Sequence, residues 1–135
     1  MTRLAADHRA PRAARAFVEG ALADGTPPDG VPADDVVLIA SELVTNAVRA
    51  GAAWVDLALR VTRRRVDLVV TDDAEGLPVL ATADHEAVGG RGLRIVDQLA
   101  DTWMVTPREK GKVVTATWLD RTAPPGGDVT LRSRR

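Results

Sequence analysis

A carboxylate and a carboxamide stand four residues apart in the segment Ser41–Val48, as Glu42 and Asn46. On a helix this spacing places the two side chains one above the other on a single face. Such a pair can hold Mg²⁺ together with its waters and phosphates, because Mg²⁺ usually takes only one or two protein oxygens. A solvated helix face has the same pattern, so the pair indicates a metal site only in combination with other groups.

A second candidate is Asp72, which continues the alternation of the apolar residues Val66, Leu68 and Val70. We expect it on the strand face that packs against the helices, where a lone carboxylate is costly unless a partner satisfies it. One such partner is a buried ligand that donates a hydrogen bond, such as the amino group of adenine. Capping of the following turn is an equally good alternative. The neighbouring residue, Asp73, is expected to point the other way.

A third candidate is the cluster Gly89-Gly90-Arg91-Gly92, which is expected to open a helix. Backbone N–H groups can converge on phosphate there, and the positive end of the helix dipole favours an anion. Arg91 would add a charge-assisted contact. Glycines at a helix start also occur as plain turns. The cluster is not a P-loop, because the chain contains no GxxxxGK[ST] motif.

The elements that would position these groups follow from the spacing of apolar residues. Helical spacing predicts a helix containing Ala14 to Leu22 and a second helix from about Pro32 to Ala50. Period-two alternation at 55–61 and 66–71 predicts a hairpin of two antiparallel strands. We expect a short helix from Gly90 and then a second hairpin, with strands at 102–106 and 112–119. This order predicts an α+β fold in which helices cover one face of a mixed, mostly antiparallel sheet.

Composition narrows the class of protein. A chain of 135 residues with 45% apolar and 27% charged residues is expected to form one globular domain, here residues 1–120, followed by a flexible tail at 121–135. The net charge of −1 gives no general attraction to nucleic acid or to an anionic membrane. Without cysteine there is no thiolate metal site, and a cytoplasmic location is expected. The two histidines, His8 and His85, are expected at the surface.

Taken together and in this order, the three candidates resemble the N, G1 and G2 boxes of the GHKL ATPase superfamily. That superfamily has the Bergerat nucleotide fold, a two-layer α/β sandwich. Segments 41–49 and 90–96, followed by 99–103, are especially similar to small stand-alone actinobacterial domains of the anti-sigma-factor serine kinase type, the RsbW and SpoIIAB kind. The resemblance covers about Arg12 to Leu119.

The resemblance implies a role for each matching residue. Asn46 would be the protein ligand of a Mg²⁺ ion that bridges the phosphates of ATP, and Glu42 would be the general base acting on a hydroxyl. Asp72 would accept a hydrogen bond from the adenine amino group. The other nucleotide contacts that the resemblance implies are Arg49, Gly76, Gly90, Arg91, Gly92, Leu93 and Thr115.

Two features depart from the family's pattern. The G1 box of the family usually has a glycine at the position of Ala74, where a need for positive φ would strain alanine. The segment between Gly76 and Gly90 is also short for a lid over the phosphates. Both features favour nucleotide binding over efficient turnover.

The resemblance implies an ATP-binding anti-sigma factor that sequesters a sigma factor and phosphorylates a STAS-domain anti-anti-sigma partner. A homodimer is what the relatives imply, with no direct contact to nucleic acid or membrane. The alternative is a non-catalytic ATP-binding regulatory module that acts by contact with another transcription regulator. The catalytic domain of a histidine kinase ranks last, because the chain contains no phosphoacceptor helix.

Overall fold

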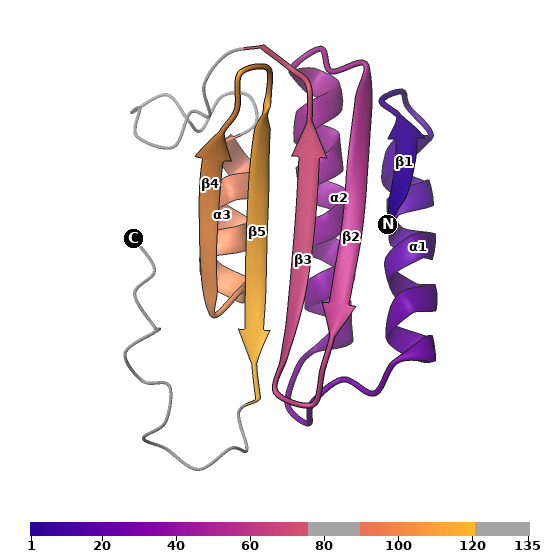
Figure 1. The fold of residues 1–135 in the computed structure, drawn as a ribbon, viewed down its shortest axis with the longest axis vertical. Coiled ribbons are helices and arrows are strands. Elements are labelled where there is room, and N and C mark those ends of the chain that lie inside the picture. The colour runs from indigo at the N-terminus through magenta and orange to yellow at the C-terminus, as the bar shows by residue number, and fades with distance from the viewer. Residues whose placement is uncertain (76–89, 121–135) are drawn as a thin grey trace.

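The computed structural model describes residues 1–75 and 90–120, and within them three helices lie against one face of a five-stranded sheet (Figure 1). The helices are α1 (Ala10–Asp24), α2 (Ala33–Arg49) and α3 (Gly90–Leu99). The strands are β1 (Thr2–Ala5), β2 (Trp54–Val61), β3 (Arg65–Asp72), β4 (Thr102–Pro107) and β5 (Lys112–Leu119). The predicted α+β two-layer fold is confirmed. The expected contact Gly76, the lid segment, His85 and the expected tail lie outside the described residues.

The sheet has the strand order β1-β2-β3-β5-β4, and each neighbouring pair of these strands is antiparallel. The β2–β3 hairpin and the β4–β5 hairpin are both confirmed. The expectation of a mixed sheet is corrected for the described strands, because no parallel pair occurs among them. In this order β5 lies between β3 and β4. Because β5 runs antiparallel to β3, the start of β5 lies directly beside the end of β3.

Burial follows the predicted apolar stripes. Ala14, Val18 and Leu22 of α1 are buried, and Gly25 follows the last residue of α1 as its C-cap. The stripe of α2 packs over the inward side chains of the central strands. Its members are Val36, Ile39, Ala40, Leu43, Val44 and Ala47. Each large apolar side chain buried in this way contributes about 1.5–3 kcal/mol. This core fixes α2, and therefore its polar flank, relative to β3.

Strand β1 was not predicted. It has four residues at the edge of the sheet, and its side chains are only half-buried or exposed, so it leaves almost no alternation to detect. Long-range contacts hold it in place. The Arg3 guanidinium donates to both carboxylate oxygens of Asp56 at 2.7 and 3.0 Å, and its Cζ lies 3.9 Å from the centroid of the Trp54 ring.

Acid is expected to weaken the attachment of β1. The hydrogen bond from Arg3 lowers the pKa of Asp56 against the opposing effect of burial. A carboxylate whose pKa is lower in the folded state adds stability above its unfolded pKa, about 3.9, and loses it as the pH falls through the folded pKa. The Tm of the parent protein should exceed that of Arg3→Met at pH 7, and the difference should narrow by about pH 2. A difference that does not change with pH would contradict this.

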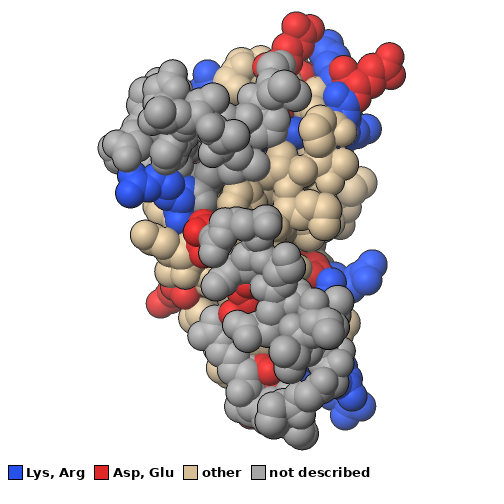
Figure 2. All heavy atoms as spheres, turned by 90° about the vertical axis from the view of Figure 1, so that its left-hand side faces the viewer, with Lys and Arg blue, Asp and Glu red and all other residues tan. Residues whose placement is uncertain are grey.

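The face of the molecule drawn in Figure 2 shows no dominant sign of charge. On the face shown in Figure 2, described acidic and basic side chains are interspersed, in keeping with the net charge of −1. Across residues 1–75 and 90–120, no helix combines the length and the apolar composition that crossing a bilayer requires.

Candidate functional site

The fold brings the three sequence candidates to one end of the molecule. Asp72 is the last residue of β3, and its register partner Lys112 is the first residue of β5. β4 begins at the end of the sheet opposite Asp72, and α3 ends just before β4. The first residue of α3 therefore lies at the Asp72 end. The C-terminal half of α2 lies at the same end, at the top of Figure 1. A helix flank, a strand end and a helix start therefore meet there.

Glu42 and Asn46 lie on the flank of α2 that faces away from α1. Ser41 marks the α1 side, because its hydroxyl accepts a hydrogen bond from Arg15 Nη1 at 3.1 Å. Each residue turns the helix by roughly 100°, so Glu42 and Asn46 point about 100° and 140° around the helix axis from Ser41. This direction is toward the side of α2 on which α3 packs. Both side chains are half-buried, and neither has a hydrogen bond or ion pair within the described part of the chain. They are available to a ligand.

Asp72 is 2% exposed and its carboxylate has two partners. Oδ1 accepts the Ala74 N–H at 2.9 Å, which is the turn cap offered above as one alternative. Oδ2 accepts from Lys112 Nζ at 2.8 Å, within a pair whose side chains are 3% and 14% exposed. The inward direction of Asp72 is confirmed. Its contact with a ligand stays a prediction.

A family model described as histidine kinase-like ATPase domain matches residues 4–118. The chain belongs to this family. The match begins within β1 and ends within β5, so it covers the three helices, β2, β3 and β4 in full, and parts of β1 and β5. Membership indicates a GHKL-type ATPase domain and ATP binding. A comparison with curated proteins gives no match.

The described residues of this histidine kinase-like ATPase domain fit a bound nucleotide. Two oxygen-bearing side chains on α2 have no protein partner among the described residues. The buried Asp72 carboxylate lies at the same end, beside an ammonium group. Among the described residues, no group of three or more His, Asp or Glu side chains is arranged to hold a metal ion.

Ala74 fits its position in the ATPase domain without strain. It is 4% exposed, and no non-glycine residue among those described has a positive φ. Gly111, by contrast, does require glycine, because its φ is +96°. A Cβ atom there would lie 1.8 Å from the backbone oxygen of Asp72. The tip of the β4–β5 hairpin therefore closes tightly over the end of β3, which brings Lys112 to Asp72.

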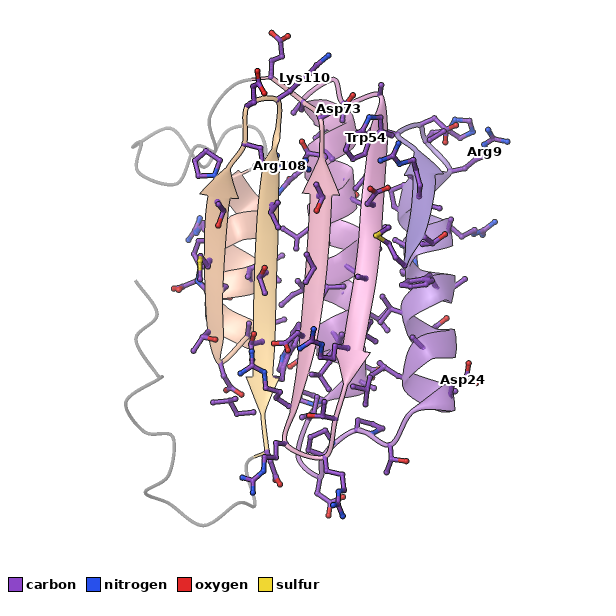
Figure 3. All side chains as sticks on the ribbon, in the orientation of Figure 1. Arg9, Asp24, Trp54, Asp73, Arg108 and Lys110 are labelled. Atoms are coloured by element: carbon purple, nitrogen blue, oxygen red, sulfur yellow. The ribbon has the colours of Figure 1, made fainter. Side chains whose placement is uncertain are left out.

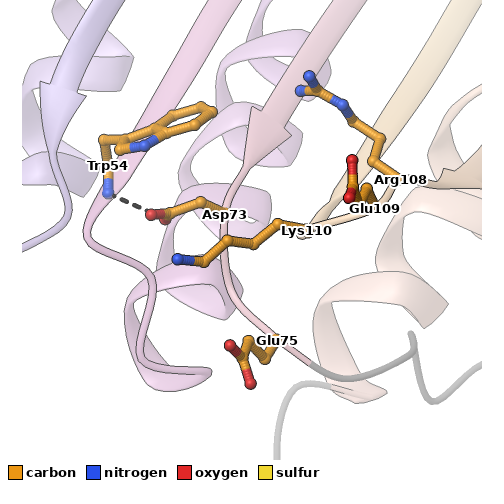
Figure 4. Close-up of a pocket in the computed structure, with 7 residues that line it drawn as sticks. Trp54, Asp73, Glu75, Arg108, Glu109 and Lys110 are labelled. Atoms are coloured by element: carbon orange, nitrogen blue, oxygen red, sulfur yellow. Dashed lines mark hydrogen bonds between the residues drawn. The ribbon is translucent and has the colours of Figure 1, made fainter.

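Asp73 points to the helix-free side of the sheet, as the alternation predicts. Burial raises its pKa, but the N–H groups of Trp54 and Ala53, donating at 3.2 and 2.8 Å, outweigh this effect and leave the pKa lowered. It lines a pocket of about 930 Å³ on that side (Figures 3 and 4). The remaining lining residues are Trp54, Glu75, Arg108, Glu109, Lys110 and Gly111. Because Asp72 points to the helix-covered side, this pocket is separate from the candidate nucleotide site.

The expected position of Thr115 is corrected by the strand register. Thr115 lies opposite Val69, whereas Lys112 lies opposite Asp72. Residues three apart on a strand point to opposite faces, so Thr115 is on the helix-free face and cannot lie beside a base that Asp72 contacts. It lines a small cavity there with Met104 and Thr117.

The remaining implied contacts are placed by their backbones. Arg49 is exposed in the last turn of α2. α3 begins at Gly90, so Arg91, Gly92 and Leu93 follow in its first turn, while their side chains lie outside the described part of the structure. Sequence reasoning missed Lys112. The signal that could have found it is its alternation with Val114, Ala116 and Trp118, the inward residues of β5.

Proposed function

We propose that this ATPase domain binds ATP between α2 and the start of α3, with its base toward Asp72, and acts as an anti-sigma factor with serine/threonine kinase activity. The observation that supports the proposal best is the half-buried pair Glu42 and Asn46, which has no protein partner among the described residues. The pair is on the C-terminal half of α2, and this half lies at the end of the sheet where β3 ends with the buried Asp72. The partners we propose are a sigma factor and a STAS-domain antagonist, with action in the cytoplasm as a homodimer.

The residues would have distinct tasks. The Asn46 carboxamide oxygen would hold Mg²⁺, and the Asp72 carboxylate would accept from the amino group of the base. The first turn of α3 would present backbone N–H groups to the phosphates. Glu42 would accept the proton of the attacking serine or threonine hydroxyl of the partner. When bound with Mg²⁺, ATP supplies the phosphoryl group, and catalysis is mostly positioning and charge stabilisation.

A second function is favoured by one observation. An effective general base is usually oriented by a neighbouring group, and Glu42 has no hydrogen-bond partner among the described residues. The alternative proposal is therefore a regulatory module that binds ATP and contacts a transcription regulator without transferring phosphate.

Substitution of Glu42 separates these two functions. With labelled ATP, Mg²⁺ and candidate STAS-domain proteins, Glu42→Gln should lower phosphotransfer by about 10²–10⁴-fold, because a positioned general base contributes that much. Its affinity for ATP should stay within about twofold of the parent protein, since loss of a base acts on the transition state. The matched control is Glu19→Gln on the exposed side of α1, which should transfer phosphate normally. ATP binding with no transfer to any partner would favour the regulatory module.

A further inference from the structure

The Lys112 side chain is largely buried, and its ammonium group has one hydrogen-bond partner among the described residues. Its side chain is 14% exposed, and its Nζ donates to Asp72 Oδ2 at 2.8 Å. An ammonium group has three N–H donors. Asp72 is its one hydrogen-bonded partner among the described residues, which leaves two donor directions open. Because a charged donor forms strong hydrogen bonds, the remaining N–H groups suit a ligand that supplies an acceptor atom.

The position of this ammonium group is well defined. Lys112 lies directly across from Asp72 in the β3–β5 ladder, and its side chain shares the inward face of the sheet. The preceding residue, Gly111, packs against the Asp72 backbone and fixes the path of the chain into β5. A carboxylate acceptor and an ammonium donor are thus held side by side at the end where the candidate nucleotide site lies.

We propose that Lys112 is a specificity-determining residue that donates a hydrogen bond to the N1 ring nitrogen of adenine. This inference rests on the proposed ATP binding. In adenine, the exocyclic amino donor and the N1 acceptor are neighbours on one edge. Asp72 accepts a hydrogen bond from the amino group while Lys112 donates one to N1. The neighbouring acceptor and donor of the protein thus match the neighbouring donor and acceptor on this edge of adenine. The ammonium group makes the second contact charge-assisted, which strengthens it.

Nucleotide analogues test the contact without altering the protein. Calorimetric titration of the parent chain should give 1-deaza-ATP, in which C–H replaces N1, an affinity about 10- to 100-fold below that of ATP. The position-matched control 7-deaza-ATP should bind as ATP does. Equal affinities for ATP and 1-deaza-ATP would overturn the proposal, as would tighter binding of GTP than of ATP. If ATP itself does not bind, the proposed function fails together with the N1 contact. If ATP binds but 1-deaza-ATP binds equally well, only the N1 contact fails.

Variants then assign the contact to Lys112. Lys112→Met should bind ATP about as weakly as the parent chain binds 1-deaza-ATP and should no longer distinguish the two nucleotides. The control Lys110→Met, on the hairpin tip, should keep the full preference. Thermal unfolding without nucleotide verifies that each variant is folded. If Lys112→Met does not fold, the analogue comparison on the parent chain decides alone. A folded Lys112→Met variant that still prefers ATP would overturn the assignment.

Discussion

Replacement of Asp72 by alanine is expected to lower the free energy of unfolding by about 3–5 kcal/mol. The substitution leaves the ammonium group of the largely buried Lys112 side chain without its carboxylate, and removal of one partner of a buried ion pair typically costs this much. The Ala74 N–H loses its acceptor at the same time. Urea denaturation at pH 7 measures the change.

Two further variants separate the ion pair from other effects. Asp73→Ala removes the neighbouring carboxylate on the opposite face and should cost clearly less, because that carboxylate accepts only from backbone N–H groups near the surface. The double variant Asp72→Leu/Lys112→Met should recover most of the stability, since replacing a buried pair by apolar residues is often neutral or stabilising. It should nevertheless fail to bind nucleotide. Full stability in Asp72→Ala would show that the pair contributes nothing to folding.

Gly111→Ala is expected to destabilise the protein by about 3 kcal/mol or more. A φ of +96° strains any residue with a Cβ by roughly 1–3 kcal/mol. The new Cβ would also overlap the Asp72 backbone oxygen, which cannot move without breaking the β3–β5 ladder. Because the same hairpin places Lys112, the affinity for ATP should fall together with stability.

The control for this variant is Gly20→Ala. Gly20 lies on the exposed side of α1, and nothing lies within 4 Å of a Cβ added there. Alanine in a helix interior should stabilise the protein by roughly 0.5–1 kcal/mol. Opposite signs for the two substitutions in urea denaturation are the expected result, and a neutral Gly111→Ala would contradict the tight closure of the hairpin.

Most of the fold could be predicted from the sequence because its elements bury regular apolar stripes. The helix from Ala33 to Arg49 and the β2–β3 hairpin both follow from side-chain period alone. β1 could not be predicted in this way, because Arg3 is held by Asp56 and Trp54, which are more than fifty residues away in the chain. Local pattern contains no information about such a partner.

The site shows the same division. Alternation along β3 predicted the inward direction of Asp72, which depends on local geometry. Alternation did not predict the contact with Lys112. Predicting that contact requires knowledge that β5 pairs with β3 and of the register of the pair. The error over Thr115 has the same origin. Glu42 and Asn46 share one face of α2, as their spacing predicts, whereas the roles proposed for them come from the resemblance to GHKL ATPases.

The most direct test of the account is calorimetric titration of ATP with Mg²⁺ into the parent chain and into the folded Asp72→Leu/Lys112→Met variant. We predict saturable binding of one nucleotide per chain in the parent protein and no measurable binding in the variant. Absence of binding to the parent chain, or equal affinity in the two proteins, would contradict a nucleotide site at the end of β3.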